Sequence, residues 1–115
     1  MKKKELALWV FMCNALRGYA SAHGLKTPDI RPFKKKWVGT YVASCSKRGV
    51  IRIATRNRHG DLFEPYHYID TMAHELAHLA HQNHSPEWFA LHIRILTDMA
   101  NNCVYKQLRK ILKKS

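Results

Sequence analysis

Two histidines four residues apart, His74 and His78, and the glutamate after the first are the residues of this chain most able to do chemistry. On an α-helix, residues i and i+4 lie on one face, so the two imidazoles can converge on one ion. Neutral imidazoles bind zinc at Zn–N distances of about 2.0 to 2.1 Å. Glu75 then lies beside the ligand pair, where a general base can reach a metal-bound water. The pattern predicts a zinc-dependent hydrolase rather than a merely solvated helix face.

A catalytic zinc needs a third protein ligand, and two more histidines, His81 and His84, follow the motif. Ligands strung along one straight helix cannot surround an ion, and His81 would lie about 10.5 Å along the axis from His74. Asn83 is a candidate helix end and Ser85-Pro86 a strong helix start, so His84 lies where the chain turns back. We therefore favour His84. The alternatives that stay open are His81, Glu87 and Asp98.

Composition limits the kind of protein and the kind of partner. The 115 residues, of which 46% are hydrophobic, suit one domain over residues 1–115. A formal net charge of +12 favours an anionic partner, with nucleic acid, DNA included, as the first candidate. The cysteines are odd in number and form no C-x-x-C pair. This usage favours a reducing compartment, so we expect a cytoplasmic protein.

The N-terminal segment has the outline of a secretory signal, with a basic start, an apolar run and the small residues Ala20-Ser21-Ala22. However, Glu5 and Asn14 interrupt the run, and Arg17 separates it from the small residues. Its apolar residues recur at helical spacing, so we predict a structural helix closed by Gly24 in a left-handed conformation. No stretch approaches the roughly 18 apolar residues of a membrane span, and we expect no membrane partner.

The middle of the chain has the pattern of β-structure. Residues 27–32 contain two prolines and predict an extended connector. Residues 37–43 and 50–56 predict two strands, joined by a turn at 46–49. The expected result is an antiparallel hairpin beneath the first helix.

A row of basic residues follows the second of these strands. Arg52 and Arg56 share one strand face, and Arg58 continues the row if the strand extends. These arginines could form a ribbon against nucleic-acid phosphates, or simply a solvated sheet face. The further candidates for phosphate contact, just before the hairpin, are Lys34, Lys35 and Lys36.

The motif helix has two opposed faces, and Pro65 marks its start. One side can pack on the core while the histidines face a cleft. Asp70 precedes His74 by one turn and could orient its imidazole, or cap the helix start. A last helical region follows Ser85-Pro86, with Asn101-Asn102 as a candidate interruption. Together the elements predict an α+β domain: an N-terminal helix on a small antiparallel sheet or hairpin, the motif helix, and one or more C-terminal helices.

This order of elements resembles the minimal zincin core of the SprT/Spartan and WLM (Wss-like) metallopeptidases and of the small YgjP-like proteins. The residues that carry the resemblance are His74–His78 and Asn83–Trp88, close to the H-E-L-x-H and N-H-G/S-P-x-F/W of these families. Trp37–Gly39, Ser44–Ser46 and Gly49–Ile51 resemble their W-x-G-x-C-S and G-x-I elements less closely. The resemblance implies zinc on the three histidines His74, His78 and His84, with Glu75 as general base. SprT and WLM members act on proteins crosslinked to DNA, which would suit the basic charge.

The expected reaction is hydrolysis of a peptide bond. Zinc would lower the pKa of its water, Glu75 would take the proton, and the hydroxide would attack a peptide carbonyl before Glu75 protonates the leaving amine. Substrate would lie antiparallel to an exposed edge of the hairpin. Tyr68 and His81 are candidates for an oxyanion donor or a fourth ligand, and Tyr66 and His67 for an oxyanion donor.

Two other classes of function stay open. The first is a basic nucleic-acid-binding or assembly protein, with either an inactive zincin fold or a structural zinc. In the structural site, His81 could occupy the fourth coordination position of the zinc ion. The second is a regulatory protease of the ImmA kind, which also carries H-E-x-x-H but cleaves one dedicated substrate.

Overall fold

A computed structural model describes residues 2–33 and 43–113, and these form an α+β fold of the zincin-like kind, as predicted. The N-terminal helix precedes the strands, and three helices follow them. The elements in chain order are α1 (Lys3–Ala22), β1 (Asp29–Pro32), β2 (Ala43–Cys45), β3 (Val50–Ile53), α2 (Pro65–His78), α3 (Pro86–Asn101) and α4 (Val104–Leu112).

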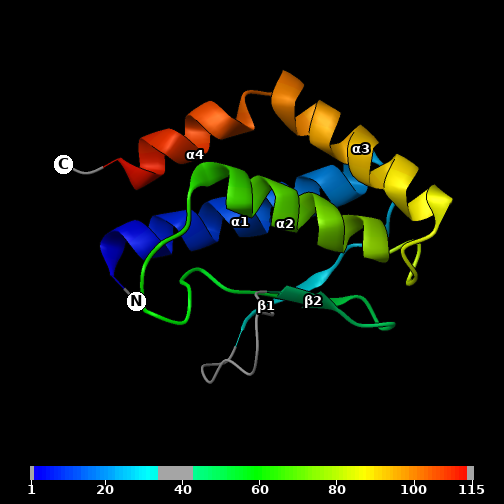
Figure 1. Ribbon diagram of the computed structural model, residues 1–115, viewed down its shortest axis with the longest axis horizontal. Coiled ribbons are helices and arrows are strands. Elements are labelled where there is room, and N and C mark those ends of the chain that lie inside the picture. The colour runs from blue at the N-terminus through cyan, green and yellow to red at the C-terminus, as the bar shows by residue number, and fades with distance from the viewer. Residues whose placement is uncertain (1, 34–42, 114–115) are drawn as a thin grey trace.

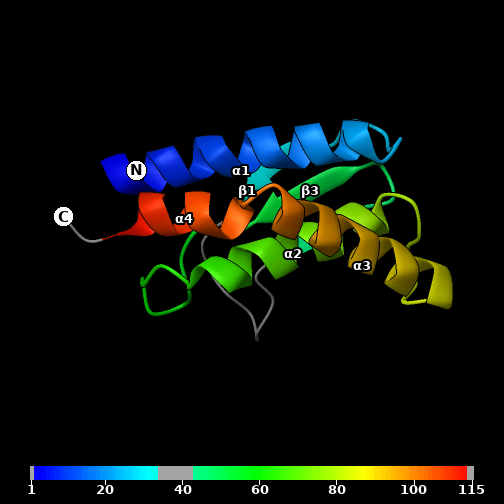
Figure 2. The same cartoon turned by 90° about the horizontal axis from the view of Figure 1, so that it is seen from above.

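The elements stack in three layers (Figure 1). The small sheet forms one outer layer, and α1 and α2 lie side by side on one of its faces. Seen from above, α3 and α4 lie between and over α1 and α2 (Figure 2). Helix α2 is therefore the central element, in contact with the sheet below and with α3 and α4 above. None of the helices within the described residues is both long and apolar enough to cross a membrane.

The sheet is mixed, with strand order β1-β3-β2. The predicted hairpin is confirmed in its described part, because β2 pairs antiparallel with β3. The connector predicted at residues 27–32 is instead partly a third strand: β1 pairs in parallel with β3, so that Ile30 faces Ile51. Pro32, the last residue of β1, is tolerated because β1 is an edge strand. The strand predicted at 50–56 ends at Ile53, and of the strand predicted at 37–43 only Ala43 is among the described residues.

The hydrophobic core lies between the sheet and the helices. From α1, Leu8, Met12 and Leu16 are fully buried, and from β3, Ile51 and Ile53. The predicted N-terminal helix is thus confirmed, but its buried stripe differs from the predicted one, because Leu6 and Val10 are exposed and Leu8 and Met12 are buried in their place. Gly24 closes the helix with φ of +67°, in the left-handed region as predicted.

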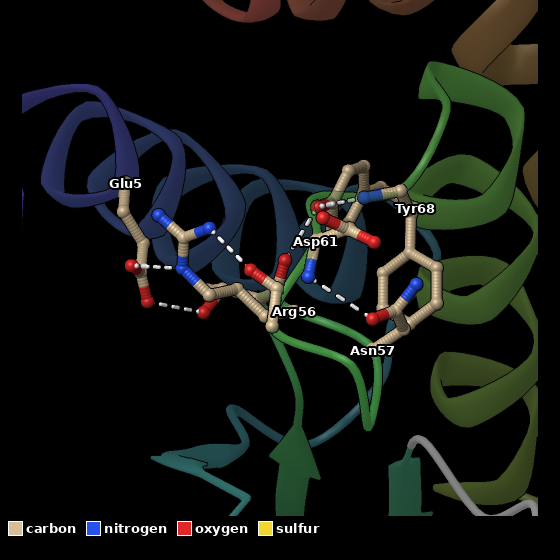
Figure 3. Close-up of polar contacts among 8 residues, drawn as sticks. Glu5, Arg56, Asn57, Asp61 and Tyr68 are labelled. Atoms are coloured by element: carbon tan, nitrogen blue, oxygen red, sulfur yellow. Dashed lines mark hydrogen bonds and ion pairs between the residues drawn. The ribbon is translucent and has the colours of Figure 1, made fainter.

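A partly buried ion pair ties the start of α1 to the chain just after β3 (Figure 3). Arg56 Nε donates to Glu5 Oε1 at 2.7 Å, and the Thr55 hydroxyl donates to Glu5 Oε2 at 2.6 Å. Burial alone raises the pKa of Glu5, but the hydrogen bonds from Thr55 and Arg56, with the Arg56 charge, outweigh it. The pKa of Glu5 therefore falls below its ordinary value.

The connection from β3 to α2 is held by Tyr68 (Figure 3). Its buried hydroxyl donates to the Thr55 carbonyl at 2.6 Å and accepts from the Phe63 amide at 2.9 Å. The tip of the same connection is closed by Asn57, whose side-chain oxygen accepts from the Asp61 amide at 3.0 Å. These bonds set the position from which α2 begins at Pro65.

Candidate metal centre

Three imidazoles converge at the C-terminal end of α2. His74 and His78 lie one turn apart on the helix, and His84 returns toward them from the turn that follows. The Nε2 atom of His78 lies 3.2 Å from that of His74 and 3.0 Å from that of His84. The Nε2 atoms of His84 and His74 are 3.4 Å apart. The structure thus brings together the three histidines expected to bind metal.

The spacing of these nitrogens fits a tetrahedral metal ion. Ligand nitrogens on a zinc ion at the usual bond length stand about 3.3 Å apart, within the observed range. Among the described residues, no further histidine, cysteine or carboxylate joins the group. Three protein ligands and one open position are the arrangement of a catalytic rather than a structural site.

The tautomer of His78 is set by the backbone of the turn. Its Nδ1 lies 2.9 Å from the His81 carbonyl oxygen, to which it can only donate. The Nε2 atom then carries the lone pair needed for a metal. Side-chain Nε2 of Gln82 donates to the His78 carbonyl at 2.7 Å, which satisfies one free carbonyl at the helix end.

Helix α2 ends at His78, five residues before the helix end predicted at Asn83. The reason is local hydrogen bonding. The amides of Leu79 and Ala80 bond three residues back, which tightens the last turn. This earlier end gives the chain enough length to bring His84 back to the group.

Trp88 forms the wall behind the three histidines, and sequence reasoning gave it no functional role. Its ring centroid lies 4.8 Å from that of His74, 5.3 Å from His78 and 4.5 Å from His84. Its indole Nε1 also donates to the His74 carbonyl at 3.3 Å. The signal was present in the sequence, because Trp88 lies in the first turn of the helix that follows His84.

The start of α3 fixes that tryptophan. Ser85 is the N-cap residue, and its hydroxyl accepts from the Trp88 amide at 3.2 Å. Pro86 occupies the first helical position, where its missing amide hydrogen costs nothing. The predicted helix start at Ser85-Pro86 is confirmed, as is the interruption after Asn101, where α3 ends.

Burial favours the neutral form of His74 and His78, which is the form that binds a metal. Desolvation lowers the pKa of His74 to about 4, helped by the neighbouring His78 and His84. The pKa of His78 is also lowered, chiefly by burial. His84 is exposed, so the group opens to solvent on its side.

Glu75 is a buried carboxyl group with a side chain that reaches toward the sheet. Only 6% of the residue is exposed, and burial raises its pKa to about 7. Cys45 on β2 lies near enough for the Glu75 charge to add to burial in raising the thiol pKa to about 11. The carboxyl group therefore lies between the metal-ligand helix and edge strand β2.

Asp70 does not take the role expected of it. Its carboxylate lies 3.2 Å from His92 Nε2 of α3, rather than against His74. The two groups are not aligned for a hydrogen bond. The His92 ring nitrogens therefore have no hydrogen-bond partner among the described residues. Asp70 cannot cap the helix start either, because α2 begins at Pro65, five residues earlier. The prediction was wrong because it could not include α3, which supplies His92.

Tyr68 is not a ligand or an oxyanion donor, because its hydroxyl is used by Thr55 and Phe63 in the core. It also precedes His74 by six residues, about 9 Å along the helix axis and on another face. The His81 imidazole lies outside the metal group, and the residue contributes its carbonyl oxygen instead. An oxyanion role for His81 stays a prediction.

The residues expected to contact nucleic acid do not form one row. Arg52 lies on β3 and Arg58 is exposed in the following loop. Arg56 is held by Glu5 and by the Gly60 carbonyl, to which it donates at 2.7 Å. Lys34, Lys35 and Lys36 lie outside the described residues.

The fold and the three-histidine group together define a zincin-like domain with the outline of a metal-dependent hydrolase. Comparison with family models carries this further: the YgjP-like metallopeptidase domain matches residues 2–114. The chain therefore belongs to the YgjP-like family. No curated protein and no solved structure matches it at a significant level. Of the families named by resemblance, YgjP-like is thus confirmed, and the SprT and WLM links stay predictions.

Proposed function

We propose that this protein is a zinc metallopeptidase that hydrolyses internal peptide bonds. The observation that carries the proposal is the convergence of three Nε2 atoms within 3.4 Å of one another, with Glu75 directly after the first ligand. His74, His78 and His84 would hold the ion. When bound, zinc supplies Lewis-acid polarisation of a carbonyl and lowers the pKa of water.

Glu75 is the general base of the proposed reaction. It takes a proton from the attacking water and returns it to the amine that leaves. Burial keeps this carboxyl group out of bulk solvent and raises its pKa to about 7, so the group can both take up and release a proton near neutral pH.

The substrate chain would add to the sheet at β2. This strand is at one edge of the order β1-β3-β2, and it runs in contact with α2. An extended peptide can pair with such an edge through main-chain hydrogen bonds, which carry little sequence preference. Glu75, which lies between β2 and α2, would then face the bound backbone. We place the substrates among nucleic-acid-associated proteins, because the net charge of +12 favours an anionic partner.

The test is Glu75→Gln, which keeps the size of the side chain and removes its base. We expect peptidase activity on a basic DNA-binding protein to fall by at least about 100-fold, while zinc stays bound. The matched control is Glu87→Gln, an exposed glutamate in the first turn of α3, which should leave cleavage unchanged. Cleavage by the Glu75→Gln protein would contradict the assignment. Cleavage of one repressor alone, indifferent to DNA, would favour a dedicated regulatory protease.

A further inference from the structure

The exposed face of α4 is mainly basic, and its exposed uncharged residues are Tyr105 and Gln107. Its basic side chains at this face, all exposed, are Lys106, Arg109, Lys110 and Lys113, and they border a shallow hollow of about 540 Å³ with Cys103 and Gln107. The helix contains no acidic residue. The start of α1, with exposed Lys2 and Lys3, lies beside the C-terminal end of α4 (Figures 1 and 2). A concentration of positive charge therefore covers one end of the molecule.

The opposite face of α4 is used by the core. Val104 and Leu108 are buried there, and Ile111 and Leu112 pack partly against the same cluster. A helix that inserts into a lipid surface needs an exposed apolar face beside its basic residues. The apolar face of α4 is buried in the core and cannot insert into a lipid bilayer. Its exposed cations therefore favour a phosphate-bearing partner other than a membrane.

An aromatic hollow of about 760 Å³ adjoins this face, between α2, α3 and α4. Tyr66 and Tyr105 stand at it with ring centroids 4.6 Å apart, and they are 66% and 37% exposed. Tyr105 precedes Arg109 by one helical turn, so the rings border the basic face. The hollow also contains one acidic residue, Asp70, whose carboxylate lies 3.2 Å from His92 Nε2 and whose side chain is 69% exposed. Exposed aromatic rings beside phosphate-binding cations are how proteins hold unpaired bases.

We infer that the basic face of α4 and the Tyr66–Tyr105 pair form a binding surface for single-stranded nucleic acid. The cations contact the backbone phosphates, and the tyrosine rings stack on bases. Tyr66 lies eight residues before His74 on α2, about 12 Å along the axis. A protein attached to a strand held on this surface could therefore reach the metal centre along α2 and be cleaved there.

The inference deepens the proposed function and rests on its nucleic-acid-associated substrates, but binding can be measured without catalysis. The probe is a labelled oligothymidylate of about 20 nucleotides, titrated with full-length Glu75→Gln protein by fluorescence anisotropy. Failure to bind and failure to cleave are then separate results. If the four α4 cations each contact one phosphate of a single strand, they contribute about −2.8 to the slope of log affinity against log salt concentration. That contribution alone weakens binding about 50-fold between roughly 50 and 200 mM salt.

Two variants with equal charge loss locate the surface. The first replaces the α4 face by glutamine, a comparable helix former, at Lys106, Arg109, Lys110 and Lys113. The second removes the same charge elsewhere, at the exposed residues Lys26, Lys47, Arg48 and Arg94. We expect the first to reduce the salt slope by about 2.8 and the second by less than about 1. Equal effects of the two variants would show general charge attraction and overturn the assignment to α4.

The stacking part is tested by Tyr66→Ala, at a side chain exposed enough to be dispensable for folding. We expect affinity for the oligonucleotide to fall about tenfold with the salt slope unchanged. A duplex of equal length should bind more weakly than the single strand and should not respond to this variant. Equal or tighter duplex binding, or unchanged single-strand affinity, would overturn the stacking assignment. Binding to vesicles of anionic lipid without binding to the oligonucleotide would overturn the nucleic-acid assignment altogether.

Discussion

At the scale of single residues, His81 shows how the backbone of a residue can matter more than its side chain. The sequence presented His81 as a fourth imidazole, yet its ring stays outside the group and its carbonyl oxygen fixes the His78 tautomer. Hydrogen bonds of this kind behind a metal ligand orient the ring and raise its basicity. The metal centre therefore depends on His81 through an atom that no substitution of its side chain removes.

We predict opposite outcomes for two neighbouring histidine substitutions. His84→Ala removes one of the three converging nitrogens and should lower zinc affinity by more than about 100-fold, beyond the loss seen for outer contacts. His81→Ala keeps the backbone carbonyl and should change the affinity by less than about threefold. Competition with a chromophoric chelator measures both. A large loss in His81→Ala with retention in His84→Ala would show that the ligand set is wrong.

Trp88 gives a second prediction, because it touches the three histidine rings without being a ligand. Trp88→Leu should lower zinc affinity by about tenfold, since the rings lose their supporting wall, and Trp88→Phe should restore part of the loss. The control is Phe89→Leu, the next residue of the same helical turn, whose side chain is 58% exposed. Equal zinc affinity in Trp88→Leu and the control would show that the indole has no positioning role.

At the scale of elements, the metal group depends on the turn between α2 and α3. Two ligands come from α2, and the third comes from the chain just before the N-cap of α3. The position of α3 against α2 therefore decides where His84 lies. This explains why a helix start, rather than a further ligand motif, was the best sequence signal for the third ligand.

Loss of the α3 cap should destabilise the protein. Ser85→Ala removes the acceptor for the Trp88 amide and should reduce the free energy of unfolding by about 1 kcal/mol, with Ser85→Asp restoring it. Thr97→Ala in the same helix removes an exposed hydroxyl that bonds back to Ile93, and should change stability by less than about 0.5 kcal/mol. Urea unfolding measures these differences. Equal stabilities of the Ser85→Ala and wild-type proteins would show that the cap does not contribute.

At the scale of the whole molecule, the Glu5 carboxylate links the start of α1 to the connection between β3 and α2. It binds Thr55 and Arg56, which follow β3 in the connection to α2, and the side chains of Glu5 and Arg56 are 14% and 32% exposed. Because α1 also packs directly against α2, this pair adds to the contacts that couple the first helix to the placement of the metal-ligand helix.

Substitution of Glu5 should make stability depend on pH. The folded state holds its pKa below the ordinary value of 4.5, so the carboxylate stabilises the fold above that pH. This stabilisation is lost as the pH falls through the lowered pKa. Glu5→Gln should therefore cost about 1 to 3 kcal/mol at neutral pH, and the difference from wild type should shrink in acid. Thermal or urea unfolding across this range, beside the exposed control Glu64→Gln, measures it. A pH-independent difference would mean that the loss is one of packing.

The sequence by itself determined the local features of this protein. Helical periodicity located α1 and α2, the glycine after α1 closed that helix, and Ser85-Pro86 started α3 where predicted. The i and i+4 spacing placed His74 and His78 together. Such spacing, helical periodicity and the signals at helix ends all act within one or two turns of the chain, so the sequence alone reveals them. The family match over residues 2–114 agrees with what these local motifs implied.

Only the tertiary structure decided which distant groups meet. The parallel pairing of β1 with β3, the use of the Tyr68 hydroxyl in the core, and the approach of Asp70 to His92 all join residues from different elements. The wall that Trp88 forms behind the histidines is of the same kind. Spacing along the chain cannot give such contacts, because they depend on how the packed helices and sheet bury their apolar faces together.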